Sequence, residues 1–156
     1  MPFATAIHDR YFEDYIKGEV HTFGSTEVVE AEVIDFARKF DPQDFHTDPD
    51  AAARTVFGGL IASGWHTAAM MMRMYADHYL TKVASLASPG LDELRWIMPV
   101  RPGDVLSVRV SIVEAVPSRS KPDRGVVTSF IEVLNQRDEV VMSMRAVNMI
   151  GRRVPG

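Results

Sequence analysis

The chain has 156 residues, with Lys+Arg 17 against Asp+Glu 21, so its formal net charge is -4, and it contains no cysteine. This length predicts a single domain whose core needs no covalent cross-links. The lack of cysteine excludes disulfides, thiolate nucleophiles and cysteine-based zinc sites. A mildly acidic chain without a long basic run argues against nucleic acid as its main partner.

Targeting and membrane signals are also missing from the sequence. The first residues, "MPFATAIHDRYFEDY", lack the basic start and apolar stretch of a secretory signal. No apolar stretch approaches the roughly 20 residues that cross a bilayer. We therefore expect a cytoplasmic protein with no membrane partner.

The first half of the chain carries helical signals after one strand. Residues 20–28 are typical of a strand, and residues 30–40 place apolar side chains at the spacing of one helical stripe. The following Asp-Pro pair ends that predicted helix, because the residue before a proline is pushed out of the helical region. Asp48 before Pro49 predicts the N-cap and first turn of a short helix through Arg54.

A long helix is predicted over residues 63–80, with Ser63 as its N-cap. Apolar side chains occupy most of its circumference, which indicates a helix buried at the centre of the molecule. We expect Trp65 and the run of methionines to build its core contacts. The apolar set is Trp65, Ala68, Ala69, Met70, Met71, Met72, Met74 and Tyr75.

The second half of the chain alternates between apolar and polar residues, as strands do. The predicted strands cover 91–100, 104–116, 125–135 and 139–150. Strands segregated from helices predict an α+β fold, with one curved antiparallel sheet wrapped around the long helix. The domain spans residues 1–156, with its core over about 20–150.

Two sets of apolar residues divide the faces of the predicted sheet. One face carries Leu106, Val108, Val110 and Ile112. The apolar residues assigned off this face are Val105, Val113, Val127, Ile131, Val141 and Val147. Apolar residues on a second face need cover, so we expect a partner subunit over the sheet or its edge, in a homodimer or a higher homo-oligomer.

The stretch "FDPQDFHTD", residues 40–48, combines acids, a histidine and phenylalanines. One interpretation is structural, with Asp48 and Asp41 at helix ends and His46 partly buried. Another is a metal site built from Asp41, Asp44, His46 and Asp48, with His66 completing a two-histidine, one-carboxylate set. The pattern does not match a calcium loop, because the turn glycine and the closing glutamate are missing.

A third interpretation is acid–base catalysis. Asp41 and His46 are five residues apart, across a loop that contains Pro42. A carboxylate beside an imidazole forms a pair in which one group accepts a proton while the other orients or donates one. Phe40 and Phe45 would provide an apolar wall that shifts the pKa values of such a pair. A water molecule between the two groups could then be activated without a metal.

Ser63 and Gly64 open the long helix, where free backbone N–H groups attract developing negative charge. Glycine allows a ligand oxygen to approach closely, since no Cβ stands in the way. A carbonyl polarised by the Gly64 N–H would form an oxyanion-type arrangement. A glycine at a helix start is by itself more typical of packing, so this hypothesis depends on the neighbouring acid–base pair.

These residues resemble the MaoC-like dehydratase family, the (R)-specific enoyl-CoA hydratases with a hot-dog fold. The family's signature, roughly Gly-Asp-x-Asn-Pro-Leu-His-x-Asp, corresponds to "FDPQDFHTD" here. "FGGLIASGWHT" resembles the segment that leads into the family's central helix, and "LRWIMPVRPGDVL" resembles the strand and turn after it. The resemblance covers the chain from about Phe23 to about Asn148, and it implies a single hot-dog domain.

The resemblance also implies roles for particular residues. Asp41 and His46 match the catalytic aspartate and histidine, and Gly64 matches the glycine whose N–H binds the thioester oxygen. Gln43 stands where the family often has an asparagine that holds the active-site water or histidine. Ser63 and Trp65 flank Gly64, and with Gln43 they are the expected substrate-binding residues.

The sequence departs from the family pattern where Phe40 replaces glycine, Gln43 replaces asparagine and Asp44 replaces proline. We expect the added charge of Asp44 to raise the pKa of Asp41 by like-charge repulsion. These departures leave the chemistry intact and bear on substrate choice.

The implied reaction is the reversible syn hydration of a trans-2-enoyl-CoA to an (R)-3-hydroxyacyl-CoA, with coenzyme A as part of the substrate and no separate cofactor or metal. The partner is therefore an acyl-CoA thioester. Two alternatives remain on the same fold: an acyl-CoA thioesterase, and a non-catalytic acyl-thioester-binding or regulatory protein. Candidate cations for the phosphates of coenzyme A are Arg95, Arg101, Arg119, Lys121 and Arg124.

Overall fold

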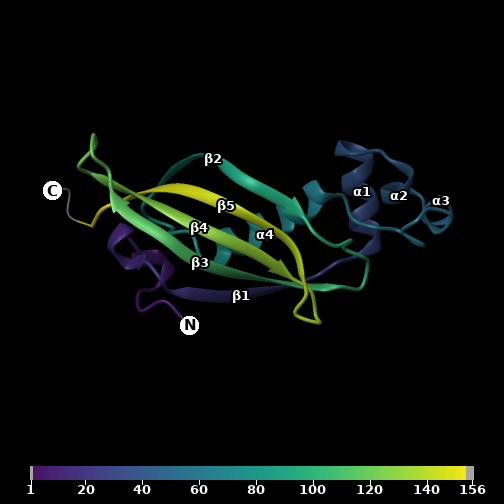
Figure 1. Cartoon of the computed structure of the whole chain (residues 1–156), viewed down its shortest axis with the longest axis horizontal. Helices are drawn as coiled ribbons and strands as arrows, with labels where there is room; N and C mark the ends of the chain where they lie inside the picture. Colours follow the sequence, from purple (N-terminus) through teal and green to yellow (C-terminus); the bar gives the residue numbers. More distant parts are fainter. Residues whose placement is uncertain (1, 154–156) are drawn as a thin grey trace.

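A computed structural model describes residues 2–153 of the chain. Within these residues, five antiparallel strands form one sheet in the order β1-β3-β4-β5-β2, with the long helix α4 against one face (Figure 1). The strands are β1 (Val20–Glu27), β2 (Ser85–Trp96), β3 (Val105–Pro117), β4 (Arg124–Leu134) and β5 (Val140–Gly151). The predicted α+β class and its single curved sheet are confirmed.

The helices are η1 (Ile7–Asp9), η2 (Phe12–Asp14), α1 (Glu30–Phe40), α2 (Asp44–Thr47), α3 (Pro49–Ala53) and α4 (Gly64–His78). The prediction of a helix over 30–40 is confirmed, and so is Asp48 as the N-cap of α3, since its carboxylate accepts from the N–H groups of Asp50 and Ala51. Helix α2 was not predicted, because four residues show no periodicity. Helices α1, α2 and α3 lie beyond one end of the sheet, opposite the two termini (Figure 1).

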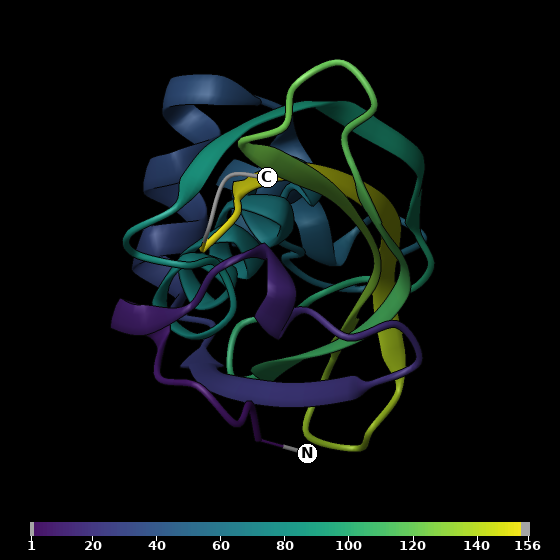
Figure 2. The same ribbon diagram turned by 90° about the vertical axis from the view of Figure 1, so that its left-hand side faces the viewer.

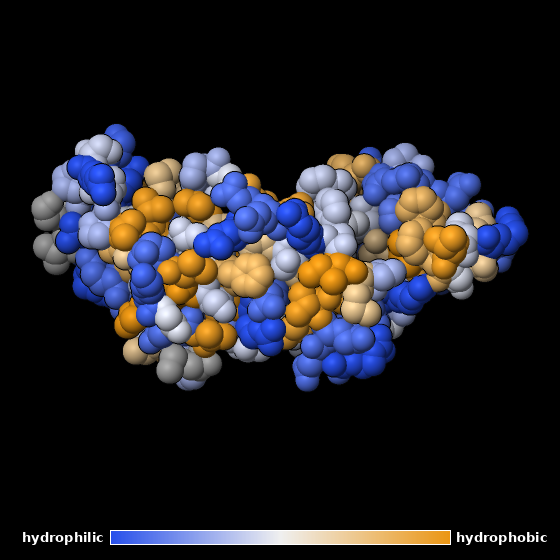
Figure 3. Space-filling model, viewed as in Figure 1, coloured by the Kyte–Doolittle hydropathy of each residue, from blue (hydrophilic) through white to orange (hydrophobic). Residues whose placement is uncertain are grey.

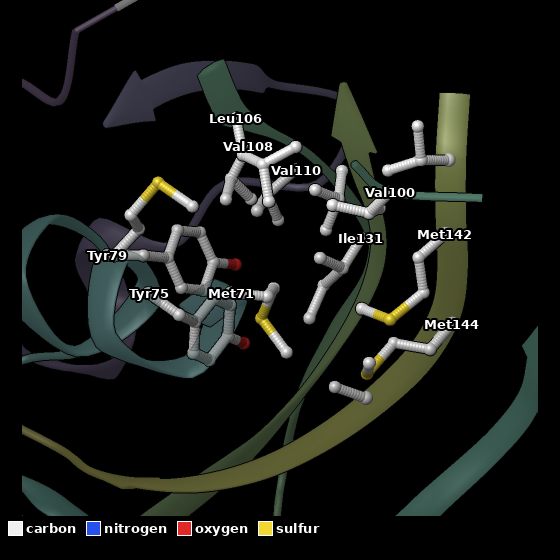
Figure 4. Packing of buried hydrophobic residues seen from close by; sticks show 14 of the residues in the cluster. Met71, Tyr75, Tyr79, Val100, Leu106, Val108, Val110, Ile131, Met142 and Met144 are labelled. Atoms are coloured by element: carbon white, nitrogen blue, oxygen red, sulfur yellow. The ribbon is translucent and has the colours of Figure 1, made fainter. Parts of the chain in front are cut away.

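The core lies between α4 and the concave face of the sheet. Met71, Tyr75 and Tyr79 point from the helix toward the strands (Figure 4), and all three are buried. On β3 the alternation is confirmed, since the whole set Leu106, Val108, Val110 and Ile112 is buried. An end view shows the sheet curving around the helix (Figure 2).

Two details of the predicted core are wrong. Trp65 is 58% exposed and Met72 is 44% exposed, so one side of α4 faces outward, with Met71 and Met74 on the buried side. Val127, Ile131 and Val141 were assigned away from the core, but all three are buried. The alternation within a strand gives two faces without saying which of them meets the helix.

Strand β2 begins at Ser85, six residues before its predicted start at Leu91. Nearly all its side chains are exposed, because it lies at the edge of the sheet. An edge strand exposed on both faces lacks the alternation from which a strand is predicted. Among the described residues, no helix has the length and apolar character needed to cross a bilayer.

Candidate active site

The loop after α1 folds back so that an acid and an imidazole meet. Asp41 is the C-cap of α1, and its N–H donates to the Ala37 carbonyl at 2.8 Å. His46 lies on α2, where its N–H donates to the Gln43 carbonyl at 2.9 Å. The His46 Nε2 atom consequently lies 3.3 Å from Asp41 Oδ2. The loop thus brings together the two residues expected to act as the acid–base pair.

The hydrogen bonds of His46 fix the position of its proton. Nδ1 lies 2.8 Å from the Ile61 carbonyl oxygen, which can only accept, so Nδ1 carries a proton. In the neutral ring, Nε2 then presents a lone pair to the Asp41 carboxylate. Two acceptors at this distance require a shared proton or a donor molecule that hydrogen-bonds to both from the side. The ring is buried, and the edge-to-face contact of Phe45, 4.4 Å between centroids, holds it in place.

The carboxylate of Asp41 accepts two short hydrogen bonds. Gln43 Nε2 donates to Oδ1 and Ser63 Oγ donates to Oδ2, each at 2.7 Å. Burial acts to raise the pKa of Asp41, but these two bonds and the nearby imidazole of His46 outweigh it and lower the pKa below its usual range. The carboxylate is therefore ionised at neutral pH.

Two expectations about the surroundings of Asp41 are wrong. Its pKa is lowered, and Asp44 is not among the groups that shift it. Phe40 is 70% exposed, so it does not form an apolar wall beside Asp41 and His46. The apolar contact comes from Phe45 alone of the two phenylalanines, because α2 turns Phe45 toward His46.

The start of α4 leaves one backbone donor free. Ser63 is the N-cap, as predicted: its Oγ accepts from the Trp65 N–H at 3.2 Å, and its carbonyl accepts from the N–H groups of His66 and Thr67. Within the described part of the chain, the Gly64 N–H has no hydrogen-bond acceptor. Because Ser63 also donates to Asp41, one fully buried residue links this helix start to the carboxylate.

Trp96, at the end of β2, covers Gly64 from outside. Its Nε1–H donates to the Gly64 carbonyl at 3.0 Å, and a Cβ built on Gly64 would overlap the indole ring. Glycine is therefore required at position 64 for close packing as well as for access to its N–H. The contact joins residues 32 apart in sequence, and no local pattern indicates it.

A pocket of about 330 Å³ lies beside these groups and is mostly apolar. His46 and Gly64 both line it. Asp41 lies outside the lining, where its carboxylate accepts hydrogen bonds from Gln43 and Ser63, which are also outside it. Segments 57–62 and 96–100 form much of its wall. The full lining is His46, Phe57, Ile61, Ala62, Gly64, Thr67, Trp96, Ile97, Met98, Pro99, Val100 and Val141.

Two residues next to Gly64 lie outside the pocket lining. Trp65 packs edge-to-face against Trp96, with 5.1 Å between ring centroids, and faces solvent. His66 stacks on Phe36 of α1, 4.7 Å between centroids at an interplanar angle of 9°. Over the described residues, no group of three or more His, Asp or Glu side chains converges as metal ligands would. His66 therefore does not complete the metal set that the sequence left open.

An imidazole and a helix N–H without an acceptor in the described chain belong to residues that line one apolar pocket, and an ionised carboxylate lies next to the imidazole. Such groups can transfer a proton and bind a developing negative charge. The chain belongs to the MaoC-like domain family, whose model matches residues 12–135. Membership agrees with the resemblance found in the sequence, and it accounts for the hot-dog arrangement of sheet and helix.

Individual relatives agree with this assignment. The chain is 28% identical to a 3-hydroxybutyryl-CoA dehydratase from Methylorubrum extorquens over 92% of this chain and 85% of that protein. The crystal structure of a MaoC-like dehydratase from Rhodospirillum rubrum is 41% identical, covers 93% of this chain and 99% of its own, and superposes with a TM-score of 0.85. The R-hydratase PhaJ1 from Pseudomonas aeruginosa shares the fold, with a TM-score of 0.73 at 23% identity over 92% of this chain and 86% of its own.

Proposed function

We propose that this protein is an acyl-CoA hydro-lyase that catalyses the reversible syn hydration of a trans-2-enoyl-CoA to an (R)-3-hydroxyacyl-CoA. One observation carries the proposal: His46 and Gly64, whose N–H has no acceptor in the described chain, line the same pocket, and Asp41 Oδ2 lies 3.3 Å from the imidazole Nε2. A conjugated thioester needs both kinds of group, one to activate water at its β-carbon and one to bind its oxygen.

The proton positions support a role for water. With the His46 Nδ1 proton held by Ile61, a water molecule can donate one hydrogen to Nε2 and the other to the Asp41 carboxylate. Its oxygen lone pair is then directed away from both groups, toward a substrate in the pocket. As the oxygen bonds to the β-carbon, the pair takes up one water proton. A proton from the pair goes to the α-carbon, so the net change is the addition of one water.

The Gly64 N–H supports the enolate stage of this reaction. When the nucleophile adds to the β-carbon, negative charge develops on the thioester oxygen. A backbone N–H at a helix start, free of any other acceptor in the described residues, is suited to bind that oxygen. Removal of one such donor costs about 10²–10³-fold in turnover in other enzymes. Gln43 and Ser63 would act through Asp41, while Trp65 would meet only the outer part of a substrate.

The relatives support the substrate class. A relative that is 28% identical over 92% of this chain is a 3-hydroxybutyryl-CoA dehydratase. That name specifies a 3-hydroxyacyl group carried by coenzyme A. We propose an acyl-CoA thioester as the substrate and a homodimer as the working assembly.

The proposal is tested with a short substrate, crotonyl-CoA, by following the loss of absorbance of the conjugated thioester. We expect Asp41→Asn and His46→Gln each to lower kcat by about 10²–10⁴-fold, the usual size of an acid–base contribution. Asp44→Asn is the matched control, because Asp44 is an exposed aspartate two residues before His46 whose carboxylate makes no hydrogen bond or ion pair with His46 in the described chain, and the variant should retain turnover.

Each alternative function gives a different product. Release of free coenzyme A thiol in place of a 3-hydroxyacyl thioester would identify a thioesterase. Tight binding of acyl-CoAs without turnover, over a panel of chain lengths, would identify a binding protein. Wild-type turnover in both Asp41→Asn and His46→Gln would contradict the assignment of the pair.

A further inference from the structure

Arg101 connects two segments of the pocket wall. It follows directly after Pro99 and Val100, which line the pocket, and its Nη2 donates to the carbonyl of Phe57, another lining residue, at 2.6 Å. The side chain is exposed. The guanidinium thus lies at the rim of the pocket, held in position by a carbonyl that belongs to the wall itself.

Most donors of this guanidinium remain available. An arginine has five N–H donors, and a single bond to the Phe57 carbonyl uses one of them. Among the described residues, no carboxylate lies within ion-pair distance of Arg101, in contrast to Arg109, which is paired with Glu132. The nearest acid in sequence, Asp104, uses its carboxylate on the Arg101 backbone N–H and on the side chain of Gln136.

Gly59 lies beside the guanidinium of Arg101. A Cβ built on Gly59 would be in ordinary van der Waals contact with Nη1, at 3.5 Å. The lack of a side chain at this position leaves that nitrogen uncovered on this side. A diglycine turn at Gly58 and Gly59 therefore keeps one face of Arg101 open beside the pocket.

We propose that Arg101 binds the phosphate that terminates the pantetheine arm of the acyl thioester. This inference rests on the proposed function, since it assigns a contact for the carrier of that substrate. The planar guanidinium fork matches the geometry of a phosphate, and prior anchoring reduces the freedom lost on binding. The same phosphate occurs in coenzyme A and in the phosphopantetheine group of a carrier protein.

The other candidate cations are less well placed. Arg124 is paired with Asp123, and the loop that contains Arg119 and Lys121 lies at the end of the sheet opposite α1, α2 and α3 (Figure 1). Arg95 is exposed and donates to the carbonyl of its own neighbour. Arg101 alone of these five bonds to a residue that lines the pocket within the described chain.

The experiment compares Arg101→Gln with the wild type on three crotonyl thioesters: that of coenzyme A, that of 4′-phosphopantetheine and that of pantetheine, which has no phosphate. Glutamine removes the charge and keeps an amide N–H donor on a shorter side chain. We expect kcat/KM to fall about tenfold, mainly through KM, for both phosphorylated substrates, the size of one charge-assisted bond. The pantetheine substrate should be unaffected. Arg95→Gln is the matched control and should not distinguish the three.

The pattern of losses over the three substrates tests the contact between Arg101 and the phosphate. An equal loss of kcat/KM on all three thioesters would mean that Arg101 only holds the pocket wall in place. A loss on the coenzyme A thioester alone would assign the contact to the nucleotide part of coenzyme A. Either result overturns the proposal. A crotonyl group on a carrier protein, as a fourth substrate, tests the second source of the phosphate. If no thioester is hydrated, calorimetry with coenzyme A still tests Arg101: an equal Kd for Arg101→Gln and wild type overturns it, while a tenfold weaker Kd supports it.

Discussion

The ionisation of Asp41 is controlled by its neighbours. Its carboxylate would be destabilised by burial, yet Gln43, Ser63 and His46 together keep its pKa low. The Gln43 side chain is exposed, lies outside the pocket lining and hydrogen-bonds to Asp41 rather than to α4. It is therefore the cleanest position from which to change Asp41 without disturbing α4.

We predict that Gln43→Ala raises the pKa of Asp41, because it removes a donor that favours the ionised form. The acid limb of the profile of kcat/KM against pH should move to higher pH, with severalfold lower activity at the acid end and little change above neutrality. The lowered pKa of Asp41 also affects the stability of the fold. Asp titrates near 3.9 when unfolded, and its folded pKa is lower, so ionised Asp41 stabilises the fold above about pH 4.

That stabilisation is lost as pH falls through the lower, folded pKa, and Gln43→Ala should weaken it. The measurement is a pH–rate profile together with urea unfolding at neutral and acid pH. Asp44→Asn serves as the control, since Asp44 does not shift Asp41. An unmoved acid limb in Gln43→Ala would show that the Gln43 bond does not tune the carboxylate.

At the level of elements, the site depends on how α1 meets α4. Helix α1 ends at the residue before Asp41, and α4 begins at Gly64. The stack of His66 on Phe36 joins the two helices next to these ends. His66 Nδ1 is buried and has no hydrogen-bond partner in the described chain. A neutral ring suits such a contact better than a charged one.

We predict that this joint weakens in acid. Burial lowers the pKa of His66, although the carboxylate of Glu32 opposes the shift. A folded pKa below the unfolded value of about 6.5 gives stability that is present above that value and is lost as pH falls through the folded pKa. His66→Phe keeps the aromatic stack and removes the titration. The thermal midpoint of this variant should fall less between pH 7.5 and pH 5 than that of the wild type.

The control for this measurement is His8→Gln, because His8 is an exposed histidine in the N-terminal segment. It should leave the pH dependence of unfolding as in the wild type. Parallel curves for His66→Phe and wild type would place the acid sensitivity elsewhere in the molecule.

For the whole molecule, the two edges of the sheet differ. At β1, the N-terminal segment gives cover, since the ring of Phe3 stacks on His21 at 3.7 Å between centroids. At β2, the exposed apolar side chains include Leu86 and Leu91, 43% and 52% exposed. On the face shown in Figure 3, hydrophobic residues form several groups between hydrophilic ones. An exposed edge with apolar side chains is a place for pairing with another chain.

We predict that a second copy of the chain covers β2. Leu91→Glu places a charge on that strand and should shift the mass measured by light scattering from dimer to monomer. Val20→Glu on β1 is the matched control, at 40% exposure on the other edge, and should leave the mass unchanged. A dimer that survives Leu91→Glu but not Val20→Glu would assign the interface to the opposite edge.

The sequence by itself determined the elements whose signals are local. The stripe of residues 30–40 gave the bounds of α1, Asp48-Pro49 gave the start of α3, Ser63 gave the cap of α4, and alternation gave β3, β4 and β5. The motif also supplied Asp41, His46 and Gly64 as candidates. These features depend on backbone torsion preferences and side-chain period, which a few neighbouring residues define.

Only the tertiary structure decided which groups meet. Ser63 reaches Asp41 across 22 residues, Trp96 reaches Gly64 across 32, and Arg101 reaches Phe57 across 44. The exposure of Phe40 and Trp65 likewise followed from the direction in which each helix packs. Such contacts depend on how whole elements are placed against one another, and a one-residue change in register would redirect them, so no short stretch of sequence specifies them.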